Sequence, residues 1–82
     1  MRVEKKDKTP TTDRISPAAL RALRLFRDRN GDRWQSALGI GFLRGGHPSM
    51  TGDEWAPIQA MRNSVPTSVV VDVLDCLSVE RI

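Results

Sequence analysis

The side chains best suited to catalysis are few and lie far apart along the chain. His47 is the only histidine, Cys76 is the only cysteine, and tyrosine is absent. Covalent or acid–base catalysis needs a nucleophile and a base that reach each other, and neither His47 nor Cys76 has an evident partner. The adjacent carboxylates Asp53 and Glu54 are better suited to the first turn of a helix. We therefore predict that the protein is not an enzyme.

A metal or cofactor site is not predicted either. One histidine, one cysteine and scattered carboxylates do not supply the four ligands of a zinc site. Gly39-Ile40-Gly41 lies within a helical pattern with no strand before it, which argues against a phosphate-binding turn. We expect no cofactor. We interpret Cys76 as a buried thiol on the last helix and His47 as a loop histidine.

Charge is distributed unevenly along the chain. Residues 1–46 carry eleven Lys/Arg and five Asp/Glu, a net +6, whereas residues 47–82 carry two and five, a net −3. A basic half attracts anionic partners, and arginine contacts phosphate through paired hydrogen bonds. This pattern supports an alternative function, a DNA-binding transcriptional regulator with a helix-turn-helix-like fold. Its candidate contacts are Arg21, Arg24, Arg27, Arg33, Gln59, Arg62 and Asn63.

The first predicted helix covers residues 17–29, after a disordered basic tail at residues 1–13. Ser16 is a suitable N-cap, Pro17 fits the first helical position, and Asn30-Gly31 is a strong stop signal. The helical period places four apolar side chains on one face, and Leu25 outside that face beside the arginines. The expected core residues are Ala19, Ala22, Leu23 and Phe26.

A second helix is predicted at about residues 33–44, with Asp32 as its cap. Trp34, Leu38 and Phe42 recur at intervals of four and form the expected core stripe, whereas Ile40 and Leu43 point away from it. A small residue recurs at the same interval at Ala37, Gly41 and Gly45, which predicts close approach of another backbone.

The rest of the chain predicts two further elements. Thr51 to Glu54 has the spacing of a capping box, so a third helix begins either at Gly52 with a kink at Pro57, or at Pro57 itself. We expect it to bury Trp55, Ile58 and Met61. The valine-rich segment near residues 67–78 suits a strand or a helix, and we favour the helix because no other segment offers a pairing strand.

These observations define the predicted architecture and its leading function. The fold class is all-α, a small bundle of three to four helices at residues 14–82. We predict a small regulatory protein that binds another protein, or itself as a homodimer, through the outward apolar residues Leu25, Ile40 and Leu43. The longest apolar run is three valines, so no membrane segment is expected and the protein is placed in the cytoplasm.

The pattern also resembles a group of short, uncharacterised bacterial proteins. That group reads as an apolar helix, then N-G-x-x-W-x-x-x-L, a glycine loop and a late R-N pair. The residues that match here are Phe26, Asn30-Gly31, Trp34, Leu38, Gly45 and Arg62-Asn63. The resemblance covers about residues 17–65, and it ends where Thr67-Ser68-Val69 replaces an expected aromatic residue. It implies an accessory protein of bacterial or mobile-element genomes and favours a regulator over an enzyme.

Overall fold

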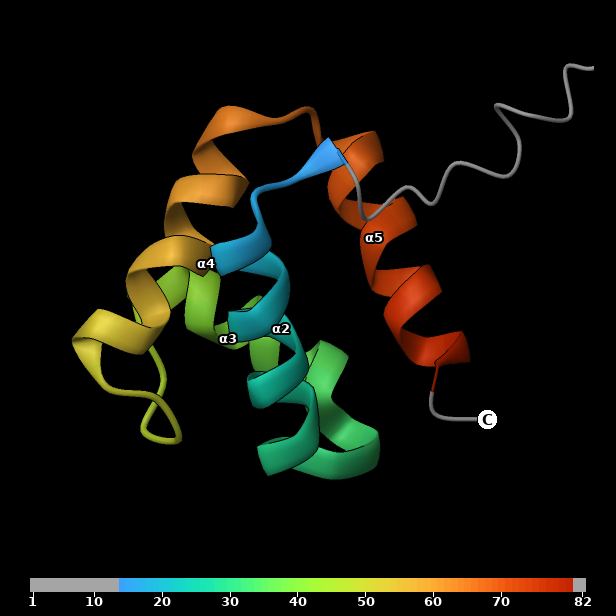
Figure 1. The fold of residues 1–82 in the computed structure, drawn as a ribbon. Coiled ribbons are helices and arrows are strands. Elements are labelled where there is room, and N and C mark those ends of the chain that lie inside the picture. Colours follow the sequence, from blue (N-terminus) through green and yellow to red (C-terminus); the bar gives the residue numbers. More distant parts are fainter. Residues whose placement is uncertain (1–13, 81–82) are drawn as a thin grey trace, which may run out of the picture.

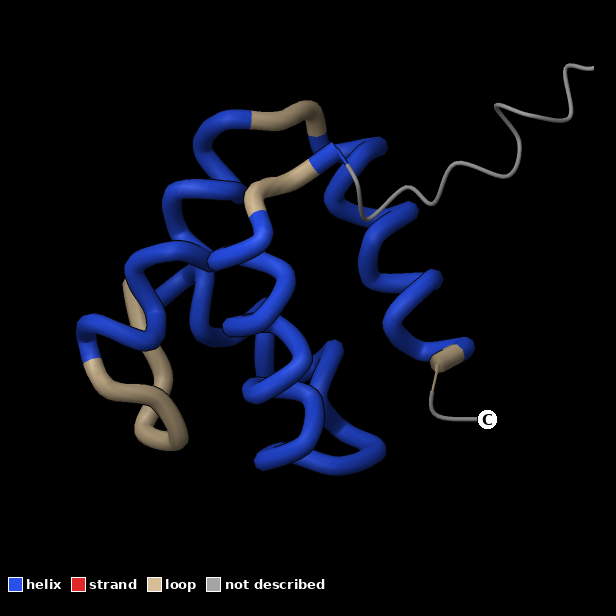
Figure 2. Tube along the Cα trace, in the orientation of Figure 1, coloured by secondary structure: helices blue, strands red, loops and turns tan. Residues whose placement is uncertain are grey.

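The structure is a computed structural model that describes residues 14–80, so the predicted tail at residues 1–13 lies outside it. The elements in order are the α-helix α2 (Pro17–Asn30), the short 3-10 helix η2 (Gly31–Arg33), and the α-helices α3 (Trp34–Arg44), α4 (Gly52–Ser64) and α5 (Thr67–Val79). No strand occurs between residues 14 and 80 (Figure 2). The predicted all-α class is confirmed.

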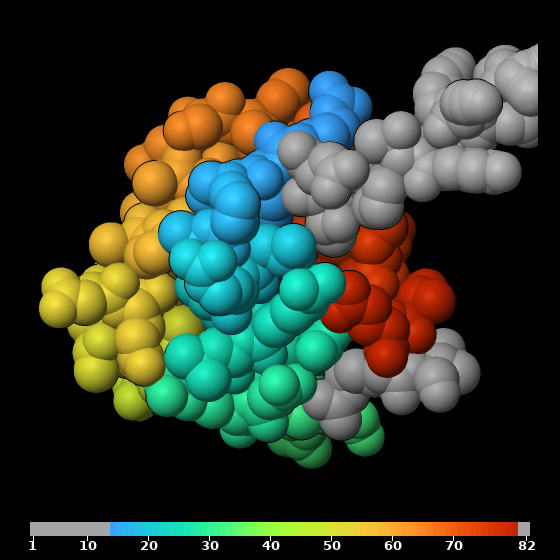
Figure 3. All heavy atoms as spheres, in the orientation of Figure 1, coloured from blue at the N-terminus to red at the C-terminus, as the bar shows by residue number. Residues whose placement is uncertain are grey.

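Helix α2 occupies the centre of the fold. In Figure 1 it crosses in front of α3, with α4 on one side and α5 on the other, and it packs directly against α3 and α4. Figure 3 shows the same arrangement in space-filling form, with α2 between the yellow and orange atoms of α4 and the red atoms of α5. A helix with neighbours on several sides needs a broad apolar surface.

The predicted start of α2 is confirmed and its end lies one residue further on. The Ser16 side chain accepts a hydrogen bond from the Ala19 amide, and Pro17 takes the first helical position. The helix ends at Asn30, because Gly31 follows with a φ of 64°, a backbone conformation that glycine adopts without strain.

The prediction that Asp32 caps the second helix is wrong. Residues Gly31–Arg33 form η2, and no side chain caps either η2 or α3. The Trp34 amide instead donates to the Gly31 carbonyl, so the 3-10 turn provides a partner for an amide at the start of α3. Helix α3 ends at Arg44, and Gly45 follows it with a φ of 80°.

Helix α4 begins at Gly52, which decides between the two predicted starting points. Thr51 and Glu54 form the predicted capping box: the Thr51 hydroxyl accepts from the Glu54 amide at 3.1 Å, and the Glu54 carboxylate accepts from the Thr51 amide at 2.9 Å. Pro57 lies inside the helix. Pro57 is the sixth residue of the helix, and because a proline has no amide hydrogen, the bond to the Asp53 carbonyl is missing there.

Helix α5 confirms the helical interpretation of the valine-rich segment. It buries Val69, Val70, Val73 and Leu77 against the other helices. Cys76 lies on the predicted helix but is only half-buried, so the prediction of a buried thiol is correct only in part. Cys76 lies at the margin of the buried face of α5. Val70 widens that face on the side opposite Cys76, so the centre of the face lies away from the thiol.

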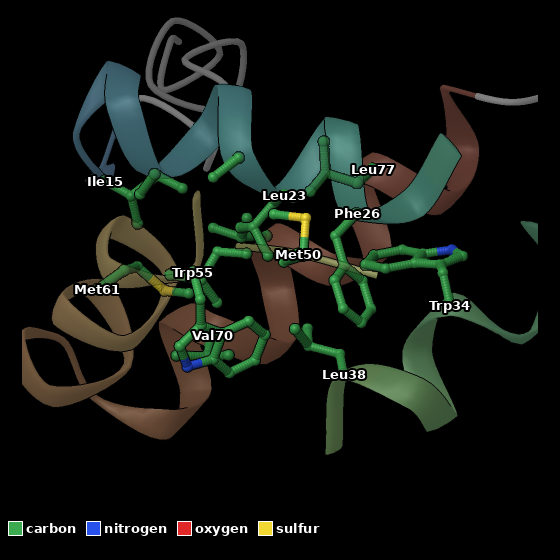
Figure 4. Packing of buried hydrophobic residues seen from close by; sticks show 14 of the residues in the cluster. Ile15, Leu23, Phe26, Trp34, Leu38, Met50, Trp55, Met61, Val70 and Leu77 are labelled. Carbon is green, nitrogen blue, oxygen red and sulfur yellow. The ribbon is translucent and has the colours of Figure 1, made fainter. Parts of the chain in front are cut away.

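The core contains residues of α2, α3, α4 and α5. Figure 4 shows Phe26 of α2 beside Trp34 and Leu38 of α3, with Trp55 of α4 and Val70 and Leu77 of α5 in the same cluster. Phe26 contacts Trp55 with ring centroids 5.9 Å apart. The predicted core residues of α2 and α4 are all buried, and so are Trp34 and Leu38, whereas Phe42 is half-buried.

The close approach predicted at Gly41 exists, but its partner is a side chain and not a backbone. A Cβ atom at Gly41 would lie 2.7 Å from Cη2 of Trp55. Gly39 and Gly45 have no atom within 4 Å of the equivalent position, so the contact is confined to one glycine.

Candidate protein-interaction surface

The outward side of α3 carries large apolar side chains that the core does not use. Leu43 is 89% exposed and Ile40 is 51% exposed, as the sequence predicts. Ser36 and Gly39 are also exposed and fall on the same side at helical spacing. We call Ser36, Gly39, Ile40 and Leu43 the α3 outer face. Apolar side chains grouped in this way are typical of a surface that meets another protein.

The α3 outer face is bordered by positive charge. Arg33 and Arg44 are exposed, and neither forms an ion pair with another residue between positions 14 and 80. At the end of the helix nearer α4, the Arg62 guanidinium lies 5.4 Å from the centre of the Phe42 ring, a cation–π contact. Helix α3 itself contains no acidic residue. A partner for this face would therefore combine apolar side chains with carboxylates.

Leu25 does not belong to this surface. It is half-buried and packs against the core cluster, so its predicted exposure is wrong. The physical reason is the central position of α2, which has neighbours on more than one side. Its apolar surface is therefore wider than the single stripe inferred from helical periodicity.

Two of the predicted nucleic-acid contacts are occupied by an internal carboxylate. Arg24 donates two hydrogen bonds to Glu80, at 3.1 and 2.7 Å, and Arg27 donates to the same carboxylate at 2.8 Å. Arg27 is buried and also donates to the Leu77 carbonyl at 2.9 Å. The expectation that Arg27 reaches an external phosphate is therefore wrong. We call Arg24, Arg27 and Glu80 the α5 clasp, because they attach the end of α5 to α2.

The clasp changes the protonation behaviour of its carboxylate. Hydrogen bonds from Arg24 and then Arg27 hold the pKa of Glu80 well below its ordinary value, at about 2. Because the folded state binds the proton more weakly than the unfolded state, the clasp stabilises the fold fully above about pH 4.5. This contribution is lost as the pH falls from there toward 2.

We expect Glu80→Gln to lower the free energy of unfolding by about 1–2 kcal/mol near neutral pH, because Arg27 keeps its burial and loses its carboxylate. Urea unfolding at a series of pH values measures the effect. The difference from the unmodified protein should shrink below pH 4.5 and vanish toward pH 2. Asp75→Asn, at an exposed site on α5, is the matched control. An equal loss in both variants at neutral pH would contradict the role of the clasp.

The remaining predicted nucleic-acid contacts are distributed over three elements, α2, η2 and α4. Arg21 and Arg33 are exposed on α2 and η2. Gln59 accepts a hydrogen bond from the Trp55 indole at 3.2 Å and donates one to Asn63 at 3.4 Å, so its amide is engaged within α4. Arg62 lies over Phe42. The structure therefore brings Gln59 and Asn63 together and leaves the arginines on separate elements.

Sequence reasoning missed a polar network that holds the 45–51 loop. Arg29 donates to both carboxylate oxygens of Glu54, at 2.8 and 3.1 Å, and to the Ser49 carbonyl. Hydrogen bonds from Arg29 and the Thr51 amide lower the pKa of Glu54 to about 2. His47 contacts the edge of Phe26, with ring centroids 5.1 Å apart, and its Nδ1 accepts from the Ser49 amide. His47 is half-buried and packs against Phe26, in agreement with its interpretation as a loop histidine. The capping-box spacing in the sequence indicates the contact between Thr51 and Glu54. The second partner of Glu54 is Arg29, which lies 25 positions earlier in the chain and which no local pattern indicates.

A groove of about 640 Å³, which no sequence pattern indicated, lies between the start of α2 and the outer side of α4. Its lining is mainly apolar and includes Ile15, Ala18, Pro57 and Met61. Between residues 14 and 80, no group of three or more His, Cys, Asp or Glu side chains is placed to hold a metal ion.

No helix in the part of the chain that the structure describes has the length and hydropathy needed to cross a membrane. The chain matches no protein-family model, no curated protein and no solved structure.

Proposed function

We propose that the protein acts by binding another protein through the α3 outer face, as a small non-enzymatic regulator of a larger partner. The observation that carries the proposal is the exposure of Ile40 and Leu43 on a helix whose opposite side is already buried. Burying a leucine or isoleucine side chain in an interface contributes about 1.5–3 kcal/mol. Two such residues one turn apart, bordered by arginines, have the composition of an interface centre with a charged rim.

DNA binding is the weaker alternative, because two of the arginines that would contact phosphate are already paired with a carboxylate inside the fold. Arg24 and Arg27 are held by Glu80, and the Gln59 amide is held by Trp55. A DNA-binding assay at several salt concentrations addresses this alternative directly, because release of counterions makes such binding fall steeply with salt. Tight, strongly salt-dependent binding that survives loss of Ile40 and Leu43 would favour the DNA-binding function instead.

Replacing Ile40 and Leu43 together with serine is expected to abolish capture of the partner and to leave the fold intact. Both side chains are exposed, so their loss changes the free energy of unfolding by only about 0.5 kcal/mol or less per site. The measurement compares proteins captured from cell extract by the unmodified protein and by the double variant, with mass spectrometry as the readout. Circular dichroism verifies the fold.

The matched control also introduces serine at an exposed position, but it replaces a charged side chain instead of an apolar one. Arg21→Ser removes an exposed side chain of α2 and should leave partner capture unchanged. Loss of helical signal in the Ile40 and Leu43 variant would show that these residues support the core. Unchanged capture by a well-folded double variant would contradict the proposed function.

A further inference from the structure

A second exposed apolar face lies on α5. Val79 is 66% exposed and Val71 is 49% exposed, and Asp72 and Asp75 are exposed on the same side. At 100° per residue these four positions fall within one sector of the helix, opposite the buried valines and leucine. We call Val71, Asp72, Asp75 and Val79 the α5 outer face.

The α5 outer face is acidic as well as apolar. Helix α5 contains no lysine or arginine between Thr67 and Val79, so nothing on the helix itself neutralises Asp72 and Asp75. Glu80, the next acidic residue, turns the other way into the clasp with Arg24 and Arg27. The face therefore presents two valines around two carboxylates.

The α3 outer face has the opposite charge. Its apolar side chains, Ile40 and Leu43, are bordered by Arg33 and Arg44, and α3 has no acidic residue. Gly39 lies within this face, and a Cβ atom there would have no neighbour within 4 Å. A helix laid on this side could therefore approach the α3 backbone closely.

We propose that the α5 outer face of one copy docks on the α3 outer face of a second copy. This inference rests on the proposed function, because it uses the same α3 outer face for binding. Both faces are exposed to solvent, so no segment between residues 14 and 80 covers them within one molecule. Opposite charges at the rim select this pairing: Asp72 and Asp75 of one copy approach Arg33 and Arg44 of the other.

Charge also argues against a symmetric pairing of like faces. Two α3 outer faces would place arginines against arginines, and two α5 outer faces would place aspartates against aspartates. Like charges brought together at an interface oppose association. The pairing of α3 with α5 is instead heterologous, so an open assembly keeps one unused α3 outer face at one end and one unused α5 outer face at the other. Such contacts form a ring where the rotation closes and an open chain where it does not.

Complementary single-face variants test this pairing. Leu43→Asp disables the α3 outer face, and Val71→Arg disables the α5 outer face. Sedimentation velocity of the unmodified protein, from micromolar to near-millimolar concentration, should show self-association that weakens with added salt. Each variant alone should associate at least about tenfold more weakly, the effect of losing about 1.4 kcal/mol at the contact. An equimolar mixture of the two variants should form a one-to-one dimer and no larger species, because only one intact pair of faces remains.

Other outcomes overturn the inference in distinguishable ways. Self-association of Val71→Arg at the unmodified strength would exclude the α5 outer face, and a mixture that stays monomeric would exclude the complementary pairing. An unmodified protein that is monomeric throughout, yet captures a different partner in a manner that depends on Ile40 and Leu43, would remove the inference and leave the proposed function standing. If the Ile40 and Leu43 double variant kept both self-association and partner capture, the result would contradict the inference and the proposed function alike. Circular dichroism and thermal unfolding verify that each variant is folded.

Discussion

Replacing Phe26 with alanine is expected to lower the free energy of unfolding by about 3–5 kcal/mol. The ring is fully buried at the centre of α2 and contacts residues from two other parts of the chain, Trp55 and His47. Truncation removes its contacts and leaves a cavity that rigid neighbours fill only partly. A chain of 82 residues has a total stability of about 4–12 kcal/mol, so this loss is a quarter of that stability or more.

Urea unfolding followed by tryptophan fluorescence measures this effect, because Trp34 and Trp55 are both in the core cluster. Leu43→Ala is the matched control: it also truncates a large apolar side chain, but one that is 89% exposed, and it should change stability by no more than about 0.5 kcal/mol. A loss below about 1 kcal/mol for Phe26→Ala would show that the core is centred elsewhere. A large loss for Leu43→Ala would show that the α3 outer face is part of the core.

The local signals in the sequence predict most of the helix boundaries. Ser16 and Pro17 identify the start of α2, and Thr51 with Glu54 identifies the start of α4, because caps depend on residues within one turn of each other. The period of the apolar residues likewise separates the buried and exposed sides of α3. These features are local, so sequence patterns are sufficient to find them. Asp32 is the exception, because a 3-10 turn took over the role of the cap.

The features that sequence patterns miss depend on which segments meet in space. Arg24 and Glu80 are 56 positions apart, and no local pattern pairs them. Arg27 is buried only because the end of α5 covers it, which turns a candidate phosphate contact into a structural one. Leu25 is covered for a related reason, since α2 has several neighbours. The candidate site is therefore predictable where it depends on one helix, as at Ile40 and Leu43, and not where it depends on packing between helices.

The two glycines of α3 provide the sharpest test of how the helices pack. Gly41→Ala is expected to be less stable than Gly39→Ala by about 1–3 kcal/mol, the usual cost of adding a methyl group to a filled space. Both substitutions gain up to about 1 kcal/mol of helix propensity, and this shared gain cancels in the comparison. Only the contact differs: the Cβ at position 41 meets the Trp55 ring at 2.7 Å, whereas position 39 faces open space.

Trp55 cannot easily move away from a new methyl group, because its ring is buried and packed between Phe26 and Phe42. Thermal unfolding of the two variants should therefore separate by several degrees, at about 4–8 °C for each kcal/mol in a domain of this size. Equal melting temperatures would mean that the Trp55 ring lies further from position 41 than the 2.7 Å between an added Cβ atom and Cη2 of Trp55. The same pair also bears on self-association, since Gly39 lies within the α3 outer face and Gly41 does not. A methyl group at position 39 should leave the fold stable and weaken docking of a second copy, which separates the packing role of one glycine from the surface role of the other.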